Sequence, residues 1–320
     1  MATMDDRSAW PRLDHAAWRD TGATLHRWTQ IVGKVRLALL PWLNHGWQVP
    51  LYVSARGLAT SAIHVASGDV FEVELDLVGH RLAIRSAGAA ERGFALVPMT
   101  VAEFHRRLLA ELAAIGVDVA IHGAPNEVED ATPFAADTVH ASYDRAAVAA
   151  FFRALVHADR VLHRFRTGFL GKASPVHFFW GSFDLAATRF SGRPAPPHPG
   201  GVPHMPDAVM REAYSHEVSS AGFWPGNDAF PEAAFYAYAY PQPEGYASAM
   251  VAPASARWSA ALGEWLLPYA DVRRADDPEA ALLAFLTSTH RAAATLGGWD
   301  PDLECAIGEE RVPRVVPAKP

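Results

Sequence analysis

Cysteine is almost absent from this 320-residue sequence, which contains only Cys305. A single cysteine cannot form an intrachain disulfide, and it cannot build a structural zinc site from several thiolates. Nothing in the cysteine content therefore indicates an oxidising compartment, and we expect a cytoplasmic protein.

Long apolar runs are also missing. No run reaches the roughly 18 residues expected of a membrane-spanning helix. The first 20 residues carry Asp5, Asp6 and Asp14 and contain no apolar core, unlike a secretory signal peptide. We expect no membrane partner.

Positive charge is in deficit, since 28 Lys and Arg against 35 Asp and Glu give a net charge of −7. Binding to nucleic acid generally needs a basic surface, so we expect no nucleic-acid partner. Dinucleotide-binding, nucleophile-elbow and His-Glu-x-x-His motifs are absent too. Gly33-Lys34 and Gly171-Lys172 lack the glycine spacing and the Ser or Thr of a P-loop. No motif indicates a cofactor.

What the sequence does contain is regular hydrophobic periodicity. Helices are predicted at 21–40, at 100–116 with a Thr100/Glu103 capping box, from an Asp144 N-cap to about 167, and at 277–296. Alternation predicts strands, the clearest being 71–77 with one face exposed to water. The other predicted strands are 49–53, 63–65, 81–85, 117–121, 176–185, 216–224 and 235–240.

Short motifs of the first half recur in the second. Residues 25–28 (LHRW) and 33–34 (GK) are echoed by 162–165 (LHRF) and 171–172 (GK), at offsets of 137 and 138 (162 − 25 and 171 − 33). We therefore predict an α+β fold of two similar tandem halves, each an antiparallel sheet flanked by helices, about a pseudo-twofold axis. Ligands often bind where two such lobes meet. The predicted organisation is a lead-in (1–20), a first repeat (21–122), a connection (123–141), a second repeat (142–304) and a flexible tail (305–320).

Several longer motifs resemble a bacterial family known only as a domain of unknown function, whose structural-genomics representative is cyanobacterial. The most specific are 174–185 (SPVHFFWGSFDL) with 188–193 (TRFSGR), and 212–226 (EAYSHEVSSAGFWPG). The resemblance extends from about residue 18 to residue 299 and implies no activity. Further matching motifs are 30–34 (QIVGK), 52–58 (YVSARGL), 142–144 (SYD) and 235–240 (FYAYAY).

Residues 162–225 concentrate histidine, carboxylate, arginine and aromatic side chains. His177, His216 and Glu217 are candidate catalytic residues for proton transfer, because histidine titrates near neutral pH. The alternative is that His177, among aromatic residues, is a hydrogen-bonded core histidine. If a helix reached His216, that residue and Glu212 would share a face and could bind a metal together with His177. A strand from Glu217 would instead leave His216 capping an element end.

Ligand-binding candidates come from the same stretch. Arg189 suits a carboxylate or phosphate, so the ligand would be small and polar or anionic. Alternatively, Arg189 forms a buried structural pair with Asp184, brought together by a bulge. The other ligand-binding candidates are Asp184, Trp180, Trp224 and Tyr238, and the aromatic rings would stack against a ligand. Tyr236, Tyr238 and Tyr240 share one sheet face, and the alternative is that this face is half-buried core whose hydroxyl groups reach solvent. The loop 193–206 is a lid or a plain linker.

Two functional hypotheses remain open. The first is a small-molecule enzyme with a His/Glu/Arg site in the C-terminal half. The second is a non-catalytic ligand-binding or scaffolding protein, in which these residues form a structural core network. Oligomeric state and substrate are not determined by the sequence.

Overall fold

Helix α1 (His15–Leu39) begins the first half of the fold. The computed structural model describes residues 9–65 and 68–309, so the predicted tail lies mostly outside the described residues. The Asp14 side chain caps α1 by accepting a hydrogen bond from the Ala16 amide. The helix thus starts before the predicted residue 21. Trp10 and Trp18 are buried, so this part of the expected lead-in belongs to the core.

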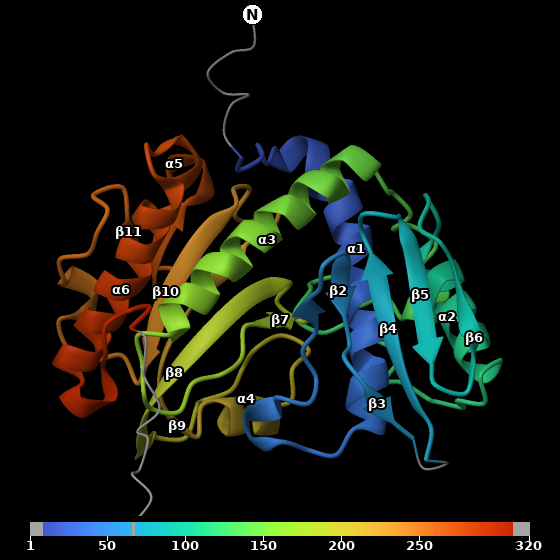
Figure 1. Ribbon diagram of the computed structural model, residues 1–320, viewed down its shortest axis with the longest axis horizontal. Helices are drawn as coiled ribbons and strands as arrows, with labels where there is room; N and C mark the ends of the chain where they lie inside the picture. Colours follow the sequence, from blue (N-terminus) through green and yellow to red (C-terminus); the bar gives the residue numbers. More distant parts are fainter. Residues whose placement is uncertain (1–8, 66–67, 310–320) are drawn as a thin grey trace, which may run out of the picture.

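Sheet 1 is antiparallel and lies against α1 and α2 (Val101–Ala113) (Figure 1). The predicted capping box is confirmed, because Thr100 accepts a hydrogen bond from the Glu103 amide. The strand order is β1-β2-β4-β5-β6, and β3 also pairs with β4. The strands are β1 (Tyr52–Val53), β2 (Gly57–Ala59), β3 (Ile63–His64), β4 (Val70–Asp76), β5 (Arg81–Ser86) and β6 (Ala89–Ala95).

Two predictions for this half are wrong. Residues 117–121 form no strand, because Val117, Val119 and Ile121 pack against the core without a strand partner. The outer face of β4 is not open to water either. Glu74 and Asp76 are only 5% and 4% exposed. They pair with arginines of neighbouring segments.

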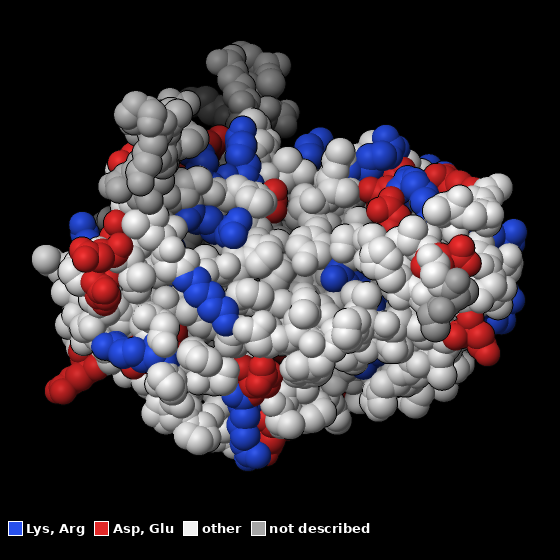
Figure 2. All heavy atoms as spheres, turned by 60° about the horizontal axis from the view of Figure 1, so that its bottom comes forward, with Lys and Arg blue, Asp and Glu red and all other residues white. Residues whose placement is uncertain are grey.

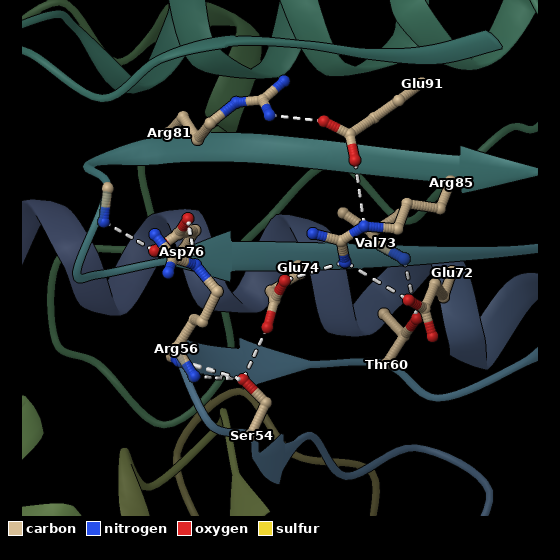
Figure 3. A network of polar contacts seen from close by, with 12 residues as sticks. Ser54, Arg56, Thr60, Glu72, Val73, Glu74, Asp76, Arg81, Arg85 and Glu91 are labelled. Carbon is tan, nitrogen blue, oxygen red and sulfur yellow. Dashed lines mark hydrogen bonds and ion pairs between the residues drawn. The ribbon is translucent and has the colours of Figure 1, made fainter.

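The outer face of sheet 1 carries a network of ion pairs (Figure 3). Arg85 donates to Glu74 at 2.8 Å and to Glu91 at 2.9 Å, and Arg56 donates to Asp76 at 2.7 Å. Half-exposed arginines therefore cover the buried carboxylates. This face is filled by its own paired side chains.

Sheet 2 is antiparallel and has α3 (Arg145–Arg166) and α6 (Pro278–Leu296) packed on one face (Figure 1). Asp144 and Asp277 cap these helices through side-chain oxygens, which confirms both predicted starts. The strand order is β11-β12-β10-β9-β8-β7. The strands are β7 (His177–Phe179), β8 (Asp184–Pro194), β9 (His216–Trp224), β10 (Ala234–Tyr240), β11 (Arg257–Ser259) and β12 (Glu264–Pro268).

Short helices complete the second half and the loops. Helix α4 (Asp207–Ala213) lies on the face of sheet 2 opposite α3, and α5 (Tyr269–Arg274) precedes α6 (Figure 1). The 3-10 turns are η2 (Asn44–Gly46), η3 (Phe134–Ala136), η4 (Tyr246–Ser248) and η5 (Pro301–Leu303). None of the helices in the described residues is both long and apolar enough to cross a bilayer.

The α+β fold with two similar tandem halves is confirmed, since helix, antiparallel sheet and helix follow in the same order twice. The equivalent positions differ from those that the sequence echo suggested. Helix ends Leu39 and Arg166, and strand starts Gly57 and Asp184, are each 127 residues apart (166 − 39 and 184 − 57). At that offset Leu25 would align with Phe152, whereas the sequence echo aligns it with Leu162.

The first strands of the two halves meet at the centre of the molecule. Leu51 and Phe178 exchange two backbone hydrogen bonds of 2.9 and 2.8 Å, and these two residues are also 127 positions apart (178 − 51). Reciprocal pairing of equivalent residues is what a twofold relation produces. One hydrophobic cluster includes buried residues of both sheets, so the halves share a core.

Candidate small-molecule site

A cavity of about 590 Å³ lies on the outer face of sheet 2, away from α3 and α6. Its floor consists of alternate residues of three strands, because side chains two apart on a strand share a face. These residues are Asp184, Ala186, Thr188 and Phe190 of β8, Val218 and Ser220 of β9, and Tyr236 and Tyr238 of β10. The volume suits a small molecule.

Segments from both halves cover this floor. Helix α4 packs on η2 of the first half, where Glu212 accepts a hydrogen bond from the His45 amide at 3.0 Å. The side chain of Asn126, in the connection, donates to the carbonyl of His204 in the loop before α4. The cavity therefore lies at the junction of the two halves. The 193–206 loop contributes part of its wall.

The mouth of the cavity is uncharged and partly apolar, and its exposed polar residues are His122, Ser182 and His204. Leu37 and Trp42 line the cavity and are also 39% and 54% exposed, so they lie at its entrance. Figure 2 shows the side of the molecule on which α4 and η2 lie, and wide areas there carry no charged side chain. An uncharged entrance favours a ligand that is largely apolar.

Asp184 is the central ionisable group of the floor. Its side chain accepts a hydrogen bond from the Tyr236 hydroxyl through Oδ2. Oδ1 is buried and has no hydrogen-bond partner within the described part of the chain. Burial raises the pKa of Asp184 to about 7, and the Tyr236 hydrogen bond opposes that rise only in part.

A glycine on β9 allows Tyr236 to reach Asp184. Gly222 lies between the two residues on β9, opposite Ala186 on β8 and Tyr236 on β10. A Cβ at Gly222 would lie 2.5 Å from the Tyr236 hydroxyl oxygen. Only glycine therefore lets the tyrosine reach across β9 to the carboxyl group.

Further hydroxyl groups extend along the floor. Tyr214 and Tyr238 share a hydrogen bond of 2.9 Å, and Thr188 and Ser220 share one of 2.8 Å. Each of these groups is both donor and acceptor, so each could also turn toward a ligand.

The opposite wall carries Lys34 and Glu127. Lys34 donates to the side-chain oxygen of Asn126, and Glu127 accepts from the Ser182 hydroxyl at 2.8 Å. Burial lowers the pKa of Lys34 to about 8 and raises that of Glu127. The Trp180 ring lies beside Lys34, and a Cβ at Gly33 would lie 2.1 Å from that ring.

Backbone strain concentrates around the cavity. Six non-glycine residues in the described ranges have left-handed φ angles, and His45, Glu127 and His204 among them line the cavity. A fourth, Phe183 with a φ of 60°, directly precedes Asp184. Such conformations cost about 1–3 kcal/mol each and cluster at functional sites.

The predicted ligand-binding residues separate into two groups. Asp184, Trp180 and Tyr238 line the cavity. Trp224 instead stacks on Phe230 with ring centroids 5.6 Å apart and does not line it. Arg189 projects to the other face of β8.

The predicted Asp184–Arg189 pair is wrong. The two residues are five apart on a strand and face opposite sides of the sheet. Arg189 donates to the Phe165 carbonyl and lies 3.7 Å from Glu304, under α3. No bulge between them turns the side chains together, since the shift in β8 follows Phe190.

The side chains of the three predicted catalytic residues have separate partners and do not converge on one site. His177 is fully buried against Trp47, and burial lowers its pKa to about 3, so its ring is neutral at pH 7. His216 begins β9 and lies 3.1 Å from the Ser215 hydroxyl. Glu217 faces α6 and pairs with Arg193 at 2.6 Å. None of the three lines the cavity.

The metal candidates do not assemble either. Helix α4 ends at Ala213 and His216 begins a strand, so Glu212 and His216 share no helix face. Across residues 9–65 and 68–309, no three or more His, Cys, Asp or Glu side chains are grouped closely enough to hold a metal ion. The proposed His177, Glu212 and His216 ligand set is therefore wrong.

The sequence analysis did not identify Lys34, Asn126 or Glu127 as site residues. Lys34 was noted only as half of a Gly-Lys pair that is not a P-loop. Asn126 and Glu127 lie in what was expected to be a polar connection. The signal available was the Gly33-Lys34 pair on a helix, where glycine is unfavourable unless something packs against it.

A comparison with protein-family models places this arrangement in a family. Residues 10–305 match the model of a family of unknown function, DUF5996. The chain belongs to this family. The match spans both sheets and every segment that lines the cavity, so the cavity lies within the DUF5996 domain. No curated protein and no solved structure matches the chain.

Proposed function

We propose that this DUF5996 protein is an enzyme that acts on a small molecule bound in the cavity of sheet 2, with Asp184 exchanging a proton. The observation that carries the proposal is the buried carboxyl group of Asp184, which lines a cavity of about 590 Å³ and whose Oδ1 has no hydrogen-bond partner among residues 9–65 and 68–309. An unsatisfied buried polar atom is costly unless a ligand completes it.

Asp184 suits general acid–base chemistry. A group with a pKa of about 7 populates its acid and base forms equally near neutral pH. Tyr236 holds Oδ2 by its hydroxyl, which leaves Oδ1 to give or take the proton. Perturbed carboxyl groups in clefts are recurrent features of active sites.

The residues that line the cavity also indicate which class of ligand it would bind. Aromatic side chains such as Trp47, Phe179 and Trp180 form much of its wall. Arg189, expected to bind an anion, lies on the other side of the sheet. We therefore favour a small, mainly apolar molecule with one or two polar groups, rather than an anion.

The proposal is tested by ligand screening and by two matched carboxyl variants. A fragment library is screened by thermal shift against the native protein, Asp184→Asn and Glu217→Gln. We expect hits whose affinity falls about tenfold or more in Asp184→Asn and is unchanged in Glu217→Gln. Equal loss in Glu217→Gln, or hits insensitive to Asp184, would contradict this site.

The alternative is a non-catalytic ligand-binding or scaffolding protein. It is supported by the structural pairing of predicted site residues, for example Arg189 with Phe165 and Glu217 with Arg193. Turnover of any screened ligand would decide for the enzyme. Tight binding at every pH without turnover would decide for the binding protein.

Three broader inferences accompany the proposal. We infer that the two halves arose by internal duplication, supported by the repeated order of elements and the 127-residue spacing (184 − 57) of equivalent strand starts. The free thiol of Cys305 fits a reducing cytoplasm. The motif resemblance supports a bacterial source. Cell fractionation of a bacterial host that encodes a family member tests the location.

A further inference from the structure

We propose that Lys34 forms an imine with an aldehyde or ketone group of the molecule bound in the cavity. This inference rests on the proposed function for the location of the ligand. It goes beyond that function by naming a nucleophile and a class of substrate.

The surroundings of Lys34 favour its neutral amine. Its side chain lines the cavity, and the residue is only 2% exposed. The amine donates to the neutral amide of Asn126 and lies 5.4 Å from the Trp180 ring centroid. No carboxylate of the described chain forms an ion pair with it. Burial without a counter-charge lowers the pKa of Lys34 to about 8, so a useful fraction is unprotonated at neutral pH.

The choice of residue at this position is also informative. The sequence contains lysine only at 34, 172 and 319, against 25 arginines (28 − 3). The other buried cations, Arg27, Arg36 and Arg189, are arginines that hydrogen-bond to backbone carbonyls. A purely structural cation at position 34 would thus follow this pattern. Lysine differs because its neutral amine can attack a carbonyl carbon and a guanidinium cannot.

The reaction needs no oxidant or cofactor. The Lys34 nitrogen lone pair forms a C–N bond to the carbonyl carbon, and the carbonyl oxygen takes up a proton to give a carbinolamine. That oxygen then leaves as water, and the C=N bond forms. In the net reaction both hydrogens of the water come from the Lys34 amine. An acid in the cavity must protonate the departing hydroxyl group and recover the proton from nitrogen.

Glu127 lines the same cavity as Lys34 and supplies that acid. It follows Asn126 in the sequence, and its own oxygen accepts from Ser182. Burial raises the pKa of Glu127, so more of it remains protonated than of an exposed carboxyl group. Asp184 is a second acid on the floor of the same cavity.

The test is reductive trapping. The full chain is incubated with benzaldehyde and sodium cyanoborohydride at pH 7, and the modified peptides are identified by mass spectrometry. Because there are three lysines, each site is assigned without ambiguity. We expect Lys34 to be alkylated roughly tenfold faster than the exposed Lys172, which lies 2.6 Å from His45, because the cavity holds the aldehyde beside Lys34. Desolvation lowers the pKa of both amines, so the expected difference rests on binding in the cavity. Faster labelling of Lys172, or no labelling of Lys34, would overturn the proposal.

Two variants complete the test. In Lys34→Met the cavity label should disappear while labelling of Lys172 is unchanged. Glu127→Gln should slow labelling of Lys34 about tenfold without changing the melting temperature by more than a few degrees. Unchanged labelling of Lys34 in Glu127→Gln would remove Glu127 from the step.

If fragments bind the native cavity yet Lys34 stays unlabelled, the imine fails and the proposed function stands. Absence of any cavity ligand would instead defeat the proposed function.

Discussion

At the scale of one residue, the fold changes the pKa of the Asp184 carboxyl group. In an unfolded chain its carboxyl group would have a pKa of about 4. In the fold it lies under Tyr236 at the floor of a cavity, and burial raises its pKa to about 7. The native state therefore binds a proton that the unfolded chain has released.

This difference predicts how stability depends on pH. The native state holds more protons than the unfolded chain between about pH 4 and 7, so the Asp184 contribution falls as pH rises through that range. Above pH 7 the loss is complete. In Asp184→Asn this loss should be absent, and between pH 5 and 7 the variant should gain roughly 2–3 kcal/mol relative to the native protein. Urea unfolding of both proteins at several pH values measures this difference in the free energy of unfolding. If the free energies of the native protein and the variant change with pH in parallel, the raised pKa of Asp184 is contradicted.

Tyr236→Phe tests the pKa of Asp184 by removing the hydroxyl group that donates to its carboxyl group. The Tyr236 hydroxyl stabilises the charged form of Asp184, so its removal should raise the pKa of Asp184 further. The infrared band of the protonated carboxyl group should then persist to higher pH. Tyr240→Phe is the matched control, because that hydroxyl donates to the Pro196 carbonyl instead. A downward shift of the titration in Tyr236→Phe would show that the hydrogen bond has been misread.

At the scale of elements, helix α1 packs against the turn between β7 and β8 through Gly33 and Trp180. Trp180 lies against Gly33 and donates from its ring nitrogen to the Val49 carbonyl at 2.9 Å. This contact places the Trp180 ring beside Lys34 and completes one wall of the cavity. A glycine that weakens the helix is thus required by the packing.

Gly33→Ala should therefore destabilise the protein. In an open helix the change stabilises by about 1 kcal/mol, but here the new methyl group would lie 2.1 Å from the indole ring. We expect a loss of about 1–3 kcal/mol in the free energy of unfolding, as for an overpacked core. Chemical denaturation measures the loss. The double variant Gly33→Ala/Trp180→Leu should recover part of it, and strict additivity of the two changes would argue against the contact.

Helix α4 illustrates an element held by few contacts. None of its residues is buried, and its attachment to the first half includes the Glu212 contacts with His45. Such segments open locally at low cost in free energy.

Glu212→Ala should loosen the cover of the cavity without unfolding the protein. We expect faster hydrogen exchange across 207–213 and a melting temperature within about 2 °C of the native value. Arg211→Ala is the control, since that side chain makes only an exposed contact with Asp207. Equal exchange in both variants would show that Glu212 does not hold the helix.

At the scale of the whole molecule, two similar sheets have different outer faces. In sheet 1 arginines and glutamates pair with one another and fill the face (Figure 3). In sheet 2 the corresponding face is covered by segments from both halves, and a cavity remains. The difference arises because the cover consists of distant parts of the chain, including η2 and α4.

The shared core predicts that the protein unfolds as one unit. One cluster of buried apolar residues includes Trp28 of the first half and Trp265 of the second. Circular dichroism and tryptophan fluorescence should therefore follow a single, coincident transition in urea. Two separate transitions would show that the halves are independent domains.

The sequence by itself determined the long helices and many of the strands, but it missed β2, β6, β11 and β12, and the strand predicted at 176–185 is β7, a turn and the start of β8. Helix caps at Thr100, Asp144 and Asp277 and most strands follow from local patterns, because caps and alternation act over a few residues. It also directed attention to Asp184, Trp180 and Tyr238. The tertiary structure decided which of the candidates meet. Arg189 and Glu217 share strands with cavity residues but face the helices, and Lys34 and Glu127 reach the site from 93 positions apart (127 − 34). Burial and long-range packing set these contacts and shift the pKa values of the buried groups, and neither is encoded in any short stretch of sequence.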